Sequence, residues 1–351
     1  MSIQNNTLSI YIANVPLLID ELGLWNSFSE RTSTIYLPNG KRQMLPPLLS
    51  ENLCSLLEDE HRLAFCMDIT FDDPINQLDI KFCNALIKIR KNYDYEDTSL
   101  FKDKDYCKIL NAVQILCKKY KYLNEINNSH DLVAYLMILM NIQCANRMGE
   151  FKDGIFRTMT VNKTESSQES SQELSPEISD FIKIWQSSSG QYSNYNERKP
   201  HDLIDGGTDY IHITSPIRRL VDLLNIMKIQ DNLGLSSWST DATAFYKKWI
   251  NKLEYINTSM KAIRKVQTDC NILHLCVSNP MILEKIYDGY IFDKQERNIY
   301  MQYTVYIPKI KIITRIKTKI QYEEYSCHQF KLYLIEDGMT LKRKIRAKIQ
   351  L

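Results

Sequence analysis

One stretch decides the fold: Tyr210 to Asp222, which reads YIHITSPIRRLVD. Its Thr214–Pro216 segment predicts a helix start, because a hydroxyl can accept a backbone N–H at the N-cap and proline suits the first turn. Arg218 and Arg219 would then lie in the first turns, where the helix dipole favours anions. A bound phosphate would offset this repulsion. A surface helix with solvated or paired arginines explains the pattern equally well.

The order of these residues also resembles a family signature. Tyr-x-His-x-Thr-Ser-Pro-Ile-Arg-Arg, followed by Asp222, is similar to the signature of the RNB exoribonucleases, which include ribonuclease II, ribonuclease R and the catalytic exosome subunit. The resemblance implies an α+β fold in which a mixed sheet packs with helices, followed by a small all-β OB-type barrel.

Upstream of this stretch, the alternation from Leu8 to Val15 predicts a buried strand, and Arg62 to Ile69 predicts another. Between them lie a Tyr-Leu-Pro motif at Tyr36, a Met-Leu-Pro motif at Met44 and the segment Leu49–Leu56. This passage resembles the family's HIADV strand, its YLP and MLP motifs and its LS…LCSL segment, in that order. The strand-like segment Leu78 to Ile89 follows.

Helical spacing predicts helices at Tyr106 to Tyr120 and Asp131 to Met148, and one long helix or two abutting helices at Thr243 to Val277. The low-complexity residues Thr164 to Pro176 predict a mobile insertion, at about 161–178. Gln186 to Gly207 is rich in Ser, Asn and Gly and predicts a loop. We therefore expect an RNB-type domain at 1–280.

After Pro280 the sequence pattern changes from helical spacing to five short apolar segments, which predict an OB-type barrel at 281–351. Lysines and arginines are frequent here, and tyrosines are interleaved among them: Tyr290, Tyr300, Tyr303 and Tyr306. Charge combined with stacking surfaces is typical of single-strand binders, so we expect single-stranded RNA as the partner. A solvated strand face with alternating lysines is the alternative interpretation.

Composition sets limits on the class of protein. A hydrophobic content of 44% and a charged content of 25% are typical of a globular protein. The net charge of +2 is small, so a polyanion partner would have to bind at a local patch of positive charge. No basic, apolar leader and no run of about 20 apolar residues occurs, so we expect a soluble, cytoplasmic protein. The nine cysteines form no C-x-x-C pair and favour reduced thiols over zinc or a disulfide framework.

The resemblance implies roles for individual residues. Arg218 corresponds to the arginine that steadies phosphate charge in the transition state, with Arg219 as a helper or a structural ion pair. Tyr36 corresponds to the tyrosine that stacks at the RNA 3′ end, and Tyr95 to a second aromatic residue near the substrate. Thr214 and Ser215 of the signature are likewise expected to contact substrate. His212 is expected to pack at a strand end, because the family mechanism needs no histidine.

The family also implies Mg²⁺, held by an aspartate cluster of the form D-x-D-D-A just upstream of the HIADV strand. This sequence starts almost at that strand and its first aspartate is Asp20, so we expect no metal ligands from this chain. Asn14 replaces the aspartate of the HIADV motif. Asp68, Asp72 and Asp73 follow a different strand and are not expected to substitute.

Three hypotheses therefore remain open from the sequence. In the first, the chain is the carboxyl-terminal part of a split or truncated exoribonuclease whose aspartates come from a second polypeptide. In the second, it is an RNB pseudoenzyme that binds RNA or protein without cutting. In the third, it is an active nuclease with displaced carboxylates.

Overall fold

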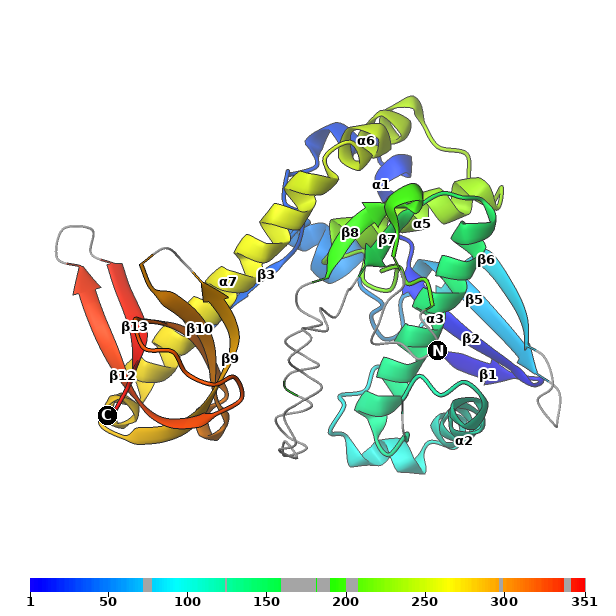
Figure 1. The fold of residues 1–351 in the computed structure, drawn as a ribbon. Coiled ribbons are helices and arrows are strands. Elements are labelled where there is room, and N and C mark those ends of the chain that lie inside the picture. Colours follow the sequence, from blue (N-terminus) through cyan, green and yellow to red (C-terminus); the bar gives the residue numbers. More distant parts are fainter. Residues whose placement is uncertain are drawn as a thin grey trace. The chain divides into compact units, whose positions relative to one another are not determined.

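The structure is a computed structural model, and it describes residues 1–71, 78–123, 125–158, 181, 190–199, 208–296, 299–337 and 342–350. The chain divides into two compact units (Figure 1). The first comprises Met1–Thr34 and Gln43–Ser259, and the second comprises Ile35–Arg42 and Met260–Leu351. The expected insertion at 161–178 lies outside the described residues.

A four-stranded antiparallel sheet organises the first unit. Its order is β1 (Ser2–Gln4), β2 (Thr7–Ala13), β5 (His61–Phe71) and β6 (Leu78–Lys88), so the strands predicted at Leu8, Arg62 and Leu78 are confirmed. Because side chains alternate along a strand, every second residue points into the core. The opposite face carries small and polar side chains, among them a Ser9–Asp68 pair and a Cys66–Cys83 pair.

Helices cover the apolar face of this sheet. The core joins that face to α2 (Lys104–Lys119), α3 (Ser129–Glu150) and α5 (Leu220–Asn232). The helices predicted at Tyr106 and Asp131 are therefore confirmed, each beginning two residues earlier than expected. Shorter helical segments complete the unit: α1 (Val15–Glu21), a 3-10 turn (Trp25–Ser27), a π-helical turn (Leu48–Leu53), 3-10 turns (Thr98–Lys102 and Tyr195–Glu197) and α6 (Thr240–Ile250).

Two further strands support the signature stretch. β7 (Ile155–Thr158) pairs with β8 (Gln191–Asn194), and Phe156 forms an isolated bridge with Ile211. The prediction of a continuous loop from Gln186 to Gly207 is therefore wrong at β8. The polar strand residues there gain order from pairing with β7, which local composition cannot reveal.

The second unit contains the hairpin β3 (Ile35–Leu37) and β4 (Gly40–Arg42), together with a five-stranded antiparallel sheet. The order of that sheet is β11-β10-β9-β12-β13, and its edge strands β11 and β13 also approach each other, so the sheet nearly closes. The expected α+β class with a barrel-like OB-type sheet is confirmed. The strands are β9 (Ile286–Glu296), β10 (Met301–Ile307), β11 (Ile312–Thr318), β12 (Cys327–Asp337) and β13 (Lys342–Ile349).

The helical pattern predicted from Thr243 to Val277 resolves into two helices, α6 and α7 (Leu253–Ser278). Two 3-10 turns, Pro280–Leu283 and Pro308–Ile310, flank the first strands of the barrel-like sheet. No helix in the described ranges combines the length and the apolar character that crossing a bilayer requires.

Asp103 fixes the start of α2. Its carboxylate accepts hydrogen bonds from the backbone N–H groups of Asp105 (2.8 Å) and Tyr106 (3.1 Å) and from the Tyr93 hydroxyl (2.5 Å). The Tyr93 hydrogen bond, followed by these backbone donors, lowers the pKa of Asp103 to about 2. The ionised carboxylate is therefore a structural group at neutral pH.

We expect Asp103→Ala to lower the free energy of unfolding by about 1–2 kcal/mol at pH 7, the usual loss for an N-cap. Because the folded-state pKa is depressed, this stabilisation is present above the ordinary value of 3.8 and is lost as the pH falls toward about 2. Urea unfolding at pH 7 and at pH 3 measures both effects. Asp105→Ala, at a half-exposed neighbour, is the control, and an equal loss in both variants would contradict this role.

Candidate nucleic-acid site

The signature stretch forms a tight turn before α5 rather than the first turn of a helix. The Ser215 carbonyl accepts hydrogen bonds from the N–H groups of Arg218 (3.1 Å) and Arg219 (3.0 Å), and α5 begins only at Leu220. The predicted helix start at Thr214–Pro216 is therefore wrong. Arg219 has extended backbone angles, φ −137° and ψ 127°, because it bridges to Ser33 on another segment. The helix-dipole argument for a bound phosphate therefore does not apply to Arg218.

A buried ion pair fixes the shape of this turn. Asp222, in the first turn of α5, is fully buried, and its Oδ1 accepts from the Ser215 N–H (2.8 Å) and from Arg219 Nη2 (2.9 Å). Burial raises the pKa of the Asp222 carboxyl, and the Arg219 guanidinium opposes that rise. Since one carboxylate oxygen holds both ends of the turn, the backbone of Arg218 has little freedom.

The segment Thr32–Thr34 holds the turn from the other side. The Arg218 carbonyl accepts from the Thr34 N–H (3.0 Å) and the Ser33 hydroxyl (2.9 Å), and the Leu220 N–H donates to the Thr32 carbonyl (3.0 Å). The side chain of Arg218 is exposed, whereas the side chain of Arg219 is only 16% exposed. The turn therefore presents one guanidinium to solvent and keeps the other for the ion pair.

Two buried asparagines connect the signature stretch to the core. Asn141 of α3 donates to the Tyr210 hydroxyl (2.7 Å) and accepts from the Ile213 N–H (3.1 Å). Asn225 of α5 accepts from the Ile155 N–H (2.9 Å) and donates to the carbonyls of Ile155 (2.9 Å) and His212 (3.0 Å). Neither residue was predicted from the sequence to have a role. A polar residue on an otherwise apolar helix was the signal that could have found them.

His212 is placed between aromatic rings. Its Nδ1 lies 2.7 Å from the Tyr192 hydroxyl, and its ring makes edge contacts with Tyr192 and Tyr210 at centroid distances of 5.7 Å. These contacts agree with the packing role expected for this histidine.

The two predicted substrate tyrosines lie on other elements. Tyr36 is 46% exposed on β3 and pairs in register with Lys41 of β4. Tyr95 is 49% exposed, and its ring stacks on His130 with centroids 4.1 Å apart and planes 13° apart. One face of the Tyr95 ring is therefore covered by His130. Thr214, Ser215, Arg218 and Arg219 are brought together by the turn itself.

The second unit carries exposed cations next to tyrosine rings. Lys317 lies 4.5 Å from the centroid of the Tyr300 ring, and Lys348 lies 5.3 Å from that of Tyr333. Tyr303 is fully buried, and its hydroxyl donates to the Tyr322 carbonyl (3.3 Å). The expectation that Tyr303 belongs to a stacking surface is therefore wrong, because its ring fills the interior of the barrel-like sheet.

The donor groups in the described part of the chain do not fit Mg²⁺. Only Cys66, Asp68 and Cys83 bring three His, Cys, Asp or Glu ligand atoms together there. Mg²⁺ requires hard oxygen ligands in near-octahedral geometry, and two thiols do not supply them. Asn14, at the place of the family's aspartate, bonds instead with the amides of Gln230 (3.1 and 3.2 Å) and Asn84 (3.0 Å). Asp72 and Asp73 lie outside the described residues.

Comparisons with known proteins agree with this architecture. Residues 2–107 match the RNB domain family. Exoribonuclease 2 of Vibrio parahaemolyticus is 45% identical over 71 residues, covering 20% of this chain and 11% of that protein. Ribonuclease R of Helicobacter pylori is 25% identical over 284 residues, covering 63% of this chain and 44% of that protein. The chain thus spans less than half the length of these relatives.

Solved structures show the same fold. Mycoplasma genitalium RNase R in complex with ribose methylated single-stranded RNA matches with a TM-score of 0.68 at 17% identity, covering 97% of this chain and 66% of that one. Yeast Ssd1, a pseudonuclease, matches with a TM-score of 0.66 at 14% identity, covering 89% of this chain and 46% of that one.

Proposed function

We propose that this chain, whose residues 2–107 match the RNB domain family, binds the 3′ end of a single-stranded RNA, in the manner of 3′-to-5′ hydrolytic exoribonucleases. The observation that supports this most is the turn at Arg218. An exposed guanidinium stands there on a backbone held by Ser33 and Thr34 on one side and by the Ser215–Asp222 contact on the other. A preorganised arginine of this kind suits a phosphate oxygen pair, because its planar donor fork loses little freedom on binding.

In this proposal, the residues of the turn have different roles in RNA binding. Arg218 contacts a backbone phosphate, and Arg219 is a positioning residue that acts through its ion pair with Asp222. Thr214 and Ser215 lie beside Arg218 in the same turn and are proposed substrate contacts. On the β3–β4 hairpin, which belongs to the second unit, Tyr36 separately offers an exposed ring for stacking on a base, and the cations Lys41 and Arg42 are exposed on the same hairpin.

The second unit, taken by itself, carries a second proposed contact surface for RNA. Five exposed cations lie in the turn before β11, on β11 itself and directly after it: Lys309, Lys311, Arg315, Lys317 and Lys319. Cations at this spacing follow a polyanion backbone, and a neighbouring ring such as Tyr300 adds stacking. This surface carries no sequence preference by itself, so we expect binding to be strongly dependent on salt.

Binding without cleavage is the second candidate function. It is favoured by the donor set, because Cys66, Asp68 and Cys83 do not suit Mg²⁺, and by the structural match to the pseudonuclease Ssd1. No similarity described above points to a second polypeptide that supplies carboxylates. A labelled single-stranded RNA with a free 3′ end, incubated with Mg²⁺ or with EDTA, separates the candidates: stepwise shortening that needs Mg²⁺ identifies an enzyme.

We expect Arg218→Ala to weaken binding of a 3′-ended single-stranded RNA by about 10- to 100-fold, since a hydrogen bond to a charged group contributes about 1.5–3 kcal/mol. Fluorescence anisotropy across a salt series measures this, and the slope of log K against log salt should flatten by about 0.7, the value for one lost contact with a single strand.

Arg147→Ala is the matched control, because Arg147 is an exposed arginine of the same unit that pairs with nearby Glu150 and lies over the Phe151 ring. Its affinity and its salt slope should equal those of the unmodified chain. Equal affinities for Arg218→Ala and Arg147→Ala at every salt concentration would refute the phosphate role of Arg218.

A further inference from the structure

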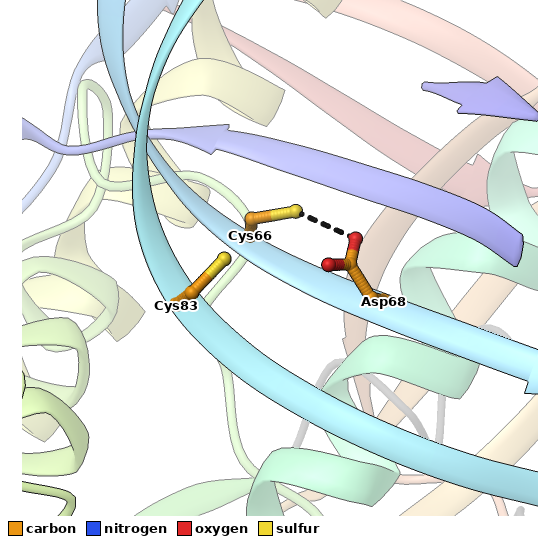
Figure 2. Close-up of side chains that lie close together, drawn as sticks. All are labelled: Cys66, Asp68 and Cys83. Atoms are coloured by element: carbon orange, nitrogen blue, oxygen red, sulfur yellow. Dashed lines mark hydrogen bonds between the residues drawn. The ribbon is translucent and has the colours of Figure 1, made fainter. Parts of the chain in front are cut away.

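Three side chains converge on the face of the four-stranded sheet that points away from the core. Cys66 and Cys83 are directly paired across β5 and β6, and Asp68 follows two residues after Cys66 on β5. Figure 2 shows the three side chains together, with the Cys66 sulfur directed at the Asp68 carboxylate. Their ligand atoms all lie within 4.8 Å of one another, and Cys66 Sγ lies 3.1 Å from Asp68 Oδ1.

We propose that Cys66, Cys83 and Asp68 form a binding site for a thiophilic divalent cation, with Zn²⁺ as its natural occupant. The donor set of two sulfurs and one carboxylate oxygen matches zinc chemistry and not that of Mg²⁺ or Ca²⁺, which prefer oxygen alone. Three protein ligands leave a fourth tetrahedral position for water.

The spacing of the ligand atoms suits a tetrahedral ion. Bonds of about 2.3 Å to sulfur and about 2.0–2.2 Å to oxygen place two sulfurs about 3.8 Å apart and a sulfur and an oxygen about 3.5 Å apart. Since the three atoms already lie within 4.8 Å of one another, small side-chain rotations are enough to reach these values. The ladder from β5 to β6 continues on both sides of the Cys66–Cys83 pair, so the two backbones stay fixed while the side chains adjust.

The surroundings of the cluster complete the geometry of a metal site. The Ser9 hydroxyl donates to Asp68 Oδ1 at 2.5 Å and orients the carboxylate, as outer hydrogen bonds do for metal ligands. Cys66 is only 2% exposed, whereas Cys83 and Asp68 are partly exposed, so an ion can approach from the side of those two residues. Lys81, directly opposite Asp68 on β6, is exposed and already pairs with Asp79 at 3.2 Å, so it offsets only part of the excess negative charge of two thiolates and a carboxylate around one Zn²⁺.

A bound ion would link β5 to β6 through side chains, in addition to the backbone ladder.

The test uses the full chain, reduced with a phosphine and stripped with EDTA, then titrated with Co²⁺ and with Zn²⁺ against a chromophoric chelator. We expect one ion per chain and a sulfur-to-Co²⁺ charge-transfer band in the near ultraviolet, which Zn²⁺ abolishes. Cys83→Ser should remove the band and lower Zn²⁺ affinity by more than about 100-fold, since even outer-sphere losses cost 10–100-fold. Ser9→Ala should lower affinity by about 10-fold.

Cys107→Ser is the matched control, because Cys107 is a partly exposed thiol of the same unit outside the cluster. Its titration should equal that of the unmodified chain, and far-ultraviolet circular dichroism checks the fold of each variant. Cys83 is more exposed than Cys66, so Cys83→Ser remains informative where Cys66→Ser fails to fold.

Two results would overturn the site. One is a reduced, folded chain that gives no thiolate–Co²⁺ band. This result includes a chain that is purified with a Cys66–Cys83 disulfide and still binds no ion once that disulfide has been reduced. The other is a band of unchanged intensity in Cys83→Ser.

Discussion

Asp222→Ala lowers the free energy of unfolding by about 3–5 kcal/mol, the loss expected when one partner of a buried ion pair is removed. The substitution leaves the Arg219 guanidinium, 16% exposed, without its carboxylate, and it removes the acceptor of the Ser215 N–H. Both unpaired groups stay away from water, so neither regains the solvation that it had in the unfolded chain.

Urea unfolding at pH 7 measures this loss, with Asp231→Ala as the control on the same helix. Asp231 also pairs with a cation, Lys228 at 3.0 Å, but its side chain is 52% exposed, so its loss should be below about 1 kcal/mol. We also expect Asp222→Ala to weaken the RNA binding proposed above, because the turn that holds Arg218 loses its anchor. Equal unfolding midpoints for the two variants would show that the pair does not define the turn.

Asn225→Leu should lower the free energy of unfolding by about 3 kcal/mol or more. Leucine fills a similar volume but leaves the Ile155 N–H and the carbonyls of Ile155 and His212 without their partner. Each buried polar group left unpaired costs about 1–3 kcal/mol. Because Asn225 is fully buried, water does not replace these bonds without local opening of the structure.

Asn225→Asp distinguishes the acceptor role of the Asn225 side chain from its donor role. It keeps an acceptor for the Ile155 N–H and replaces the amide donor by an oxygen that faces two carbonyls. A carboxyl in that place must be protonated to donate, so this variant should be more stable at pH 5 than at pH 8. Asn232→Ala, at the end of the same helix, is the control and should lose less than about 1 kcal/mol. A loss for Asn225→Leu equal to that of the control would contradict the proposed role.

Local patterns were enough to predict most of the elements. The alternation around Leu8 and the three- and four-residue spacing in α2 and α3 each describe one buried face, and burial of that face is what stabilises the element. The RNB signature supplied the overall architecture, and the fold comparisons agree with it.

Predictions that depended on long-range contacts were less successful. The helix start expected at Thr214 was wrong because the bridge between Ser33 and Arg219 holds the backbone extended, and no local signal reports a partner 186 positions away. Tyr303 was expected on a surface, but strand pairing turns its ring inward. A search for C-x-x-C pairs compares neighbours in sequence and does not detect cysteines that meet across two strands, such as Cys66 and Cys83, so the preference for plain thiols over zinc stays a prediction.

The contact between Thr32–Thr34 and Arg218–Leu220 also has a consequence for how the chain folds. Ser33 and Arg218 are 185 residues apart in sequence, so this contact closes a loop that contains most of the first unit. Closing a long loop is entropically unfavourable until the segments inside it are ordered, and topologies with such distant contacts fold slowly. We therefore expect the turn that carries Arg218 to form late in folding, after the sheet and α3. When the unit is destabilised, the backbone amides of this turn should be among the first to lose protection against hydrogen exchange.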